Sequence, residues 1–174
     1  MGTGWDHGFS QIAEVRFTNG ATSTLEANGG YTTYAGASFL PALDGRLATR
    51  VTAGFKYDAI RARNGSVSYR AFPLEVSERL DLGPLRLGLG ASLVVGPRLS
   101  GRLDSQSAHQ DLRTSLGLVG RLACAFPCPS GACELELGAR GVLQRFQASS
   151  GGPATDANAI GLYAEVHLGG GRKP

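Results

Sequence analysis

Charged residues are scarce in this chain of 174 residues, at 18% of the sequence, whereas an average soluble domain holds about 25%. Aromatic residues make up only 7%, and methionine and tryptophan occur once each. Because hydrophobic residues still reach 42%, the composition excludes a disordered chain, which combines low hydrophobicity with high net charge. The 26 glycines argue against a helical bundle, since glycine destabilises a helix interior by about 1 kcal/mol relative to alanine. The length suits a single domain over residues 1–174.

Long apolar segments are also missing. The longest stretch without a charge, residues 27–43, contains an asparagine, three glycines and a proline, so no transmembrane helix is predicted. The first residues have neither the basic nor the apolar stretch of a signal peptide. The net charge of +3 is small and scattered, whereas a nucleic-acid site needs clustered lysine and arginine, so we expect no nucleic-acid partner.

Cysteine is limited to Cys124, Cys128 and Cys133, which lie close together. No pair has the C-x-x-C spacing of a zinc site, and no phosphate loop or dinucleotide fingerprint occurs, so we expect no metal and no cofactor. Cys124 and Cys133 share a register on either side of a predicted turn and can form a disulfide in an oxidising compartment. Cys128 could instead pair with either of them. Equally, all three cysteines could be reduced and serve as apolar residues at the rim of the membrane.

The most prominent pattern in the sequence is a period of two residues. Between Leu85 and Gly96, leucine, alanine and valine alternate with arginine, glycine and serine, which is typical of a strand with one apolar face. The same alternation recurs seven times. Eight amphipathic strands are therefore predicted, around residues 9–17, 31–39, 47–58, 72–80, 85–96, 112–122, 134–144 and 160–168.

The predicted links between these strands alternate in length. After the second, fourth and sixth strands they are short and rich in proline and glycine: 41–45, 81–84 and 127–131. After the first, fifth and seventh strands they are longer and polar: 18–30, 100–111 and 148–157. The third link, at residues 61–66, is shorter, and Asn64-Gly65 in it indicates a tight turn between two long strands. Short turns at one end and long loops at the other are typical of an outer-membrane barrel.

Two features of the polar face indicate that it points into the barrel. Glycine is frequent there, which suits strands that crowd a narrow interior. Arginine provides nearly all of its cations, and its planar guanidinium is the better partner for a desolvated carboxylate. The predicted lumen charge network has eight cations and six anions: Arg16, Arg50, Lys56, Arg79, Arg86, Arg113, Arg121 and Arg140, with Glu14, Asp58, Glu75, Glu134, Glu136 and Glu165.

With this arrangement the chain resembles the small eight-stranded outer-membrane barrels of bacteria, the OmpA/OmpX-like superfamily. The stretches most like that family are residues 72–76, 87–91 and 158–166, and the resemblance covers about residues 7–168, with 169–174 as a flexible tail. It implies an all-β fold, an eight-stranded antiparallel up-and-down transmembrane β-barrel. It also implies a monomer in the bacterial outer membrane, in contact with the lipid bilayer and lipopolysaccharide.

An eight-stranded barrel is only just wide enough for its own side chains. The predicted charges would therefore close the lumen, and the expected role is structural or surface-interacting, without enzymatic activity. At most we expect a narrow, low-conductance path, weakly biased toward anions by the two extra cations. A loop ligand is left open. The alternative is a soluble, lipocalin-like barrel whose apolar face points inward around a small apolar ligand.

Three groups of residues suit catalysis less well than structural roles. Ser105, His109 and Asp111 in one polar loop contain the residue types of a catalytic triad, but nothing in the sequence orients a base toward a hydroxyl. His167 near Glu165, and the pair Glu134 and Glu136, are better explained as members of the charge network.

Overall fold

The computed structural model describes residues 1–16, 20–42, 46–62, 65–103 and 106–168. Most of this part of the chain is in strands, and it contains no helix long and apolar enough to cross a membrane. The strands are β1 (Gly2–Gly8), β2 (Gln11–Arg16), β3 (Thr22–Glu26), β4 (Gly30–Ala42), β5 (Leu47–Ala62), β6 (Gly65–Leu82), β7 (Leu85–Leu103), β8 (Gln106–Asp111), β9 (Ser115–Pro127), β10 (Cys133–Leu143), β11 (Arg145–Phe146), β12 (Thr155–Asp156) and β13 (Ala159–Leu168).

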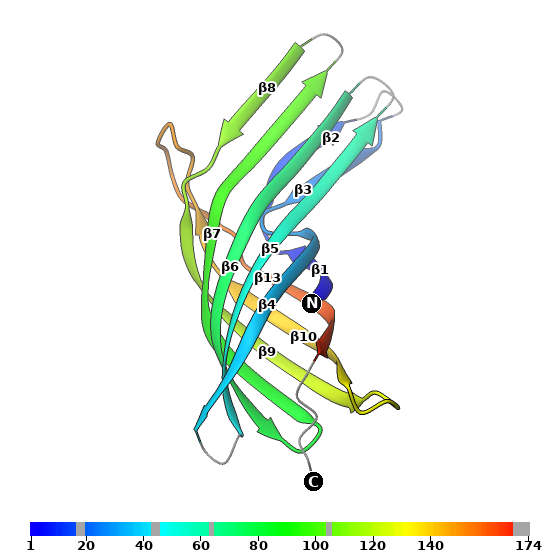
Figure 1. Ribbon diagram of the computed structural model, residues 1–174. Coiled ribbons are helices and arrows are strands. Elements are labelled where there is room, and N and C mark those ends of the chain that lie inside the picture. The colour runs from blue at the N-terminus through cyan, green and yellow to red at the C-terminus, as the bar shows by residue number, and fades with distance from the viewer. Residues whose placement is uncertain (17–19, 43–45, 63–64, 104–105, 169–174) are drawn as a thin grey trace.

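Eight of these strands form a closed antiparallel barrel (Figure 1). Their order is β6-β5-β4-β1-β13-β10-β9-β7, and pairing between β6 and β7 closes the ring. Each barrel strand pairs with the barrel strands before and after it in the chain, and β1 pairs with β13. The predicted eight-stranded up-and-down barrel is confirmed.

The two ends of the barrel differ in the way the sequence predicts. Short links join β6 to β7 and β9 to β10 at the lower end in Figure 1. At the upper end the strand pairs β2–β3 and β11–β12 belong to the long links, and β8 extends β7 as a hairpin. Parts of the predicted links 18–30, 41–45, 61–66 and 100–111, and the tail 169–174, lie outside the described residues.

The first barrel strand differs from the predicted one. The alternating segment at residues 9–17 forms β2, which pairs only with β3, and the barrel strand is β1, which precedes it. The inward positions Gly2 and Gly4 carry no side chain because space there is short: a Cβ on Gly2 would lie 2.6 Å from the Tyr34 ring. Without large side chains, β1 has almost no hydrophobic alternation for a sequence reading to detect.

The alternation in β2 and β3 arises from packing over the upper end of the barrel. Leu25 and Ala27 are fully buried with Tyr69 of β6 and Phe146 of β11 in one apolar cluster. Partly buried residues of β2 pack against it as well. We call this cluster the apolar cap: Leu25, Ala27, Tyr69, Ala71, Val94, Phe146 and Ala157.

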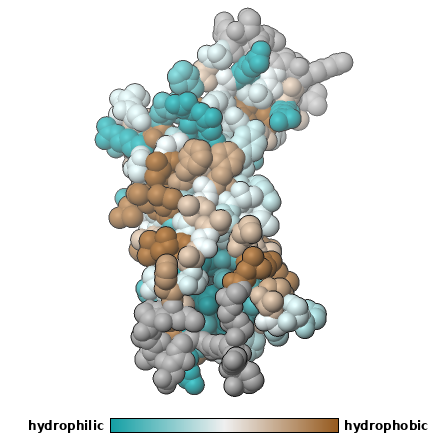
Figure 2. Space-filling view, in the orientation of Figure 1, coloured by the Kyte–Doolittle hydropathy of each residue, from teal (hydrophilic) through white to brown (hydrophobic). Residues whose placement is uncertain are grey.

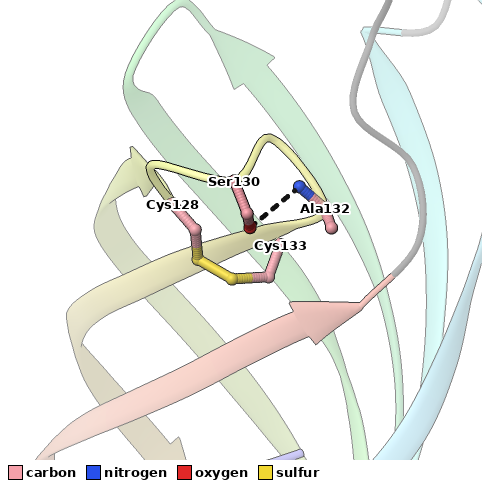
Figure 3. Close-up of a disulfide and its surroundings, with 4 residues drawn as sticks. All are labelled: Cys128, Ser130, Ala132 and Cys133. Carbon is pink, nitrogen blue, oxygen red and sulfur yellow. Dashed lines mark hydrogen bonds between the residues drawn. A yellow bond between two sulfur atoms is a disulfide. The ribbon is translucent and has the colours of Figure 1, made fainter.

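The disulfide joins Cys128 to Cys133, so the predicted Cys124–Cys133 pairing is wrong (Figure 3). The register of β9 with β10 is the reason, because it pairs Pro127 with Glu134 and Cys124 with Leu137. The two bonded cysteines then face each other across the turn with Cα atoms 5.3 Å apart. Cys124 is a free, exposed cysteine.

Thiol counting tests this pairing. We expect one reactive thiol in the unfolded, unreduced protein and three after reduction. Cys124→Ser should leave no free thiol before reduction, whereas Cys128→Ser should leave two. Losing the disulfide should lower the free energy of unfolding by about 2 kcal/mol, the loop-closure value for so short a loop. Mass spectrometry after alkylation gives the count, and two thiols left in Cys124→Ser without reduction would contradict the pairing.

Candidate functional site: the charged barrel interior

The barrel interior holds a column of charged side chains. Among the described residues it contains six cations and six carboxylates, and every one of them takes part in at least one ion pair. They come from seven of the eight barrel strands: Asp6, Arg50, Lys56, Glu75, Arg79, Asp81, Arg86, Arg121, Glu134, Glu136, Arg140 and Glu165. Their side chains point inward because successive residues of a strand alternate between the two faces of the sheet.

The upper end of the column centres on Lys56. Its Nζ lies 2.5 Å from Asp6 Oδ2 and donates to the carbonyl oxygen and the Oδ1 of Asn28, at 2.8 and 2.9 Å. All three residues are buried. On the other side of Asp6, Arg140 Nε lies 3.5 Å from Oδ1, so this carboxylate joins two cations.

Glu75 links two arginines in the middle of the column. Arg140 Nη2 lies 2.9 Å from Oε1, and Arg121 Nη2 donates a hydrogen bond to Oε2. The guanidinium of Arg121 also lies between two aromatic rings, 5.5 Å from the centre of Tyr34 and 5.0 Å from that of Tyr163. Such contacts over a ring face stabilise a cation that has been removed from water.

Arg50 continues the column below the tyrosines. It donates to Glu165 Oε2, and its Nη1 lies 3.8 Å from Glu136 Oε1. Glu136 also accepts a 2.6 Å hydrogen bond from the Tyr163 hydroxyl and has His167 Nε2 at 3.2 Å. One carboxylate therefore holds together side chains from three strands.

The lower end of the column leads to the short turns. Arg79 Nε and Arg86 Nε lie 3.0 and 3.2 Å from the same oxygen of Asp81. Arg86 Nη2 reaches both oxygens of Glu134, at 2.9 and 3.0 Å, and its Nη1 donates to the Gly83 carbonyl at 2.7 Å. Arg79 Nη1 lies 3.6 Å from Glu136, which joins this group to the one above.

These contacts leave almost no free space in the interior. The cavity among Arg50, Arg79, Arg86 and Arg121 has a volume of about 10 Å³, close to the smallest space that admits one water molecule. At the upper end the apolar cap covers the column. The described charged side chains are therefore closely packed around this cavity.

The structure places most of the predicted network residues in this column. Eight are buried: Arg50, Lys56, Glu75, Arg86, Arg121, Glu136, Arg140 and Glu165. Arg79 and Glu134 are partly buried and ion-paired within it.

Four predicted network residues lie elsewhere. Glu14 and Arg16 are exposed on β2, as a consequence of the misplaced first strand, and Arg113 is exposed in the link before β9. Asp58 is partly buried near the upper end, where it accepts a hydrogen bond from the backbone amide of Ala59.

Sequence reasoning missed two carboxylates, Asp6 and Asp81. Asp6 lies on β1, the strand that the sequence reading does not predict. The available signal is its place between Trp5 and His7: if these two residues point outward, Asp6 points inward. The sequence pattern places Asp81 in the turn 81–84, whereas β6 extends through it. With both included, the described interior is balanced in charge, so the predicted anion bias loses its basis.

Glu136, Glu165 and His167 have potential ligand atoms within 4.8 Å of one another, as a metal site requires. Arg50 contacts both carboxylates, and Arg79 lies 3.6 Å from Glu136. A metal cation would therefore face two guanidinium groups, and the arrangement is better explained by ion pairing.

Of the residues predicted as poor catalytic candidates, His109 and Asp111 lie on β8, and Ser105 lies outside the described residues. The others, Glu134, Glu136, Glu165 and His167, lie on β10 and β13 in or beside the interior column. Asp111 pairs with Arg98, whose hydrogen bond holds the pKa of that carboxyl below its ordinary value. His109 is exposed on the same strand, opposite Ser100 of β7.

The outer surface of the barrel has the opposite character from the interior. Among the described residues, 26 large hydrophobic side chains are exposed. In Figure 2 hydrophobic side chains gather across the middle of the molecule, with hydrophilic ones above them. Exposed aromatic residues lie toward the upper edge of this apolar band, including Tyr31, Phe55, Tyr57 and Phe72, and toward its lower edge, Phe39 and Phe126. Trp5 lies between these edges, directly beside Leu162.

The fold and the site together define an eight-stranded antiparallel β-barrel with buried charged residues. Comparison of the chain with protein-family models, curated proteins and solved structures finds no match.

Proposed function

We propose that this protein is an integral outer-membrane β-barrel with a closed lumen and a structural or surface-interaction role. One observation carries the proposal: the outward face is apolar and exposed while the inward face is charged and buried. Such an apolar outer face is unfavourable in water, and soluble monomers rarely expose a contiguous apolar patch above a few hundred Å². In a bilayer the same face is solvated by acyl chains.

The strand dimensions support the same proposal. A tilted transmembrane strand needs about 9–11 residues, and β10 and β13 have 11 and 10. The longer β5, β6 and β7 extend beyond such a span at the upper end. Aromatic side chains toward both boundaries suit the two membrane interfaces, where amphipathic rings are enriched.

The closed column supports a non-conducting role. An open pore needs a water-filled interior, whereas paired charges fill this one and the apolar cap covers its upper end. We infer that the protein acts through its surfaces or as a component of the envelope.

Planar-bilayer recording tests the non-conducting role. The refolded protein should show no stable open level, because the ion pairs and the apolar cap block the path. Arg86→Ala with Glu134→Ala should open only the lower end, and so should also fail to conduct. Stable, reproducible steps from the unmodified protein would contradict a closed lumen.

The membrane proposal is tested by refolding with and without detergent. We expect precipitation in plain buffer, and in detergent a folded band whose gel mobility changes after boiling. A monodisperse protein without detergent would overturn the proposal and favour the soluble barrel. That alternative places an apolar ligand inside, so ligand identification would then be the next step.

A further inference from the structure

Besides the charged interior, the barrel has a polar surface on its outside. This surface lies above the exposed Phe55 of β5 and Phe72 of β6. It is formed by the upper parts of β5, β6, β7 and β8, which extend beyond the other strands in Figure 1. A ligand-binding role for this surface rests on the proposed function, because it requires the outward face to meet a lipid leaflet.

The strand register arranges this surface in three rows. Directly paired residues of neighbouring strands project to the same face of a sheet. The lowest row is Tyr57, Arg70, Arg98 and Asp111; the next is Ala59, Ser68, Ser100 and His109; the highest is Arg61, Ser66, Arg102 and Ser107. Phe55 and Phe72 continue the same face downward, with ring centres 5.4 Å apart.

The register also sets the height of the rows above the apolar band. Two residues along a strand advance by roughly 7 Å, so the row with Arg70 lies about that far above Phe55 and Phe72 along the strands. The row with Arg102 lies two further steps up. With strands tilted by about 45°, the three rows lie roughly 5, 10 and 15 Å above these rings, and the headgroup region on each side of a hydrocarbon core is about 5–8 Å thick. The lower two rows, with Arg98 and Ser100, therefore lie at headgroup depth.

The middle of this surface is hollow. The hollow has a volume of about 300 Å³ and is bordered by Arg98, Arg102 and His109. Between them the lining residues are small, among them Ser68 and Ser100. The long cationic side chains stand around short side chains that carry hydroxyl groups. This arrangement leaves space for a ligand group that accepts several hydrogen bonds.

The surface is strongly cationic. Its rows contain four arginines and one carboxylate, a formal charge of +3 with His109 neutral. Arg98 is paired with Asp111. Arg61, Arg70 and Arg102 form no ion pair with any residue that the structure describes. An anion is therefore the complementary ligand.

We propose that this hollow binds the phosphomonoester headgroup of a membrane lipid. A phosphomonoester carries nearly two negative charges and three acceptor oxygens at neutral pH. The guanidinium groups of Arg98 and Arg102 pair with such oxygens in a planar, two-pronged geometry, and the serine hydroxyls donate to the remaining lone pairs. The hollow faces sideways from the barrel wall, directly above the apolar band, so a headgroup can enter it while its acyl chains lie against Phe55 and Phe72.

Native mass spectrometry of the detergent-solubilised protein tests this site. The probes are short-chain phosphatidic acid, a phosphomonoester; phosphatidylglycerol, a phosphodiester; phosphatidylcholine; and inorganic phosphate. We expect phosphatidic acid to bind most tightly. Arg98→Gln with Arg102→Gln should weaken that binding by about tenfold or more, since two charge-assisted contacts are lost.

The matched control is Arg113→Gln with Arg145→Gln. It removes the same charge from exposed positions near the same end, one in an ion pair with Asp156 and one without an ion pair among the described residues. Binding should change less than about twofold. Equal losses in both double variants would overturn the site, as would equal binding of phosphatidylcholine. Inorganic phosphate binding as tightly as phosphatidic acid would show a free-anion site and overturn the lipid assignment.

Gel mobility before and after boiling is measured on every sample, so a misfolded variant is recognised. If the double variant does not fold, Arg102→Gln alone replaces it, because Arg102 has no ion pair within the described part of the chain. A protein that stays monodisperse without detergent contradicts the proposed function itself. Loss of lipid selectivity in a protein that needs detergent contradicts only this site.

Discussion

Replacing Glu75 by glutamine is expected to lower the free energy of unfolding by about 3–5 kcal/mol, the cost of breaking a buried ion pair by removing one partner. Glu75 is buried between Arg121 and Arg140. Glutamine keeps the volume of the side chain but removes its charge. Arg121 then loses the only carboxylate with which it is paired among the described residues, in a place that water cannot reach. Urea unfolding in lipid vesicles, followed by the fluorescence of Trp5, measures the effect.

Glu78→Gln is the matched control for this prediction. Glu78 lies three residues further along β6 on the outward face, where it is exposed and accepts a hydrogen bond from Thr49. It shares a row with Phe39 at the lower edge of the apolar band, where water reaches the side chain. Exposed charged contacts contribute about 0–1 kcal/mol, so this variant should be nearly as stable as the parent. Similar losses in both variants would contradict the network as a source of stability.

Replacing Leu162 by arginine is expected to destabilise the protein in vesicles by about 2–4 kcal/mol, the cost of a cation on the lipid-facing side of a barrel near the bilayer midplane. Leu162 is 71% exposed on β13. Its direct neighbours across the strands are Trp5 and Ala139, so no carboxylate lies opposite the new charge. The measurement is the shift in urea unfolding in vesicles.

Leu168→Arg provides the control within the same strand. Leu168 is 69% exposed, almost as much as Leu162, but lies six residues further along β13, roughly 20 Å at the usual rise of a strand. Near an interface the same substitution costs only about 0–1 kcal/mol. Equal and small effects at both positions would contradict a lipid-facing surface, because water solvates the two sites alike.

The sequence predicted the barrel well where large residues alternate with small or charged ones. In β7, leucines point outward and Arg86, Gly88, Gly90 and Ser92 inward, so both the strand and its faces could be read directly. The glycine and proline of the short links supplied the turns. Arginine and glutamate on the inward faces then predicted most of the interior column.

The sequence could not predict what depends on close packing between distant strands. In β1 the inward residues Gly2 and Gly4 are glycine because the Tyr34 ring lies beside Gly2, and the Leu162 carbonyl and the Tyr163 Cβ lie beside Gly4. Neither tyrosine is near β1 in sequence, so the strand and its Asp6 were missed. The alternation of β2 was real but had another cause, the apolar cap, which depends on residues from β3, β6, β7 and β11.

The disulfide shows a similar limit on a smaller scale. Cys124 and Cys133 were compatible by parity, but the choice of partner depends on where the turn begins. The turn lies after Cys128, whose backbone amide donates to the Cys133 carbonyl at 2.9 Å. A shift of the turn by two residues would have changed the pairing, and the sequence does not determine where the turn begins.

The most direct test of the account is whether its single tryptophan touches lipid. Trp5 is 58% exposed on the outward face of β1, so in vesicles its emission should be quenched by lipids with bromine on the acyl chains and protected from acrylamide in the water. Emission that brominated lipids leave unchanged, while acrylamide quenches it, would contradict a membrane-embedded barrel.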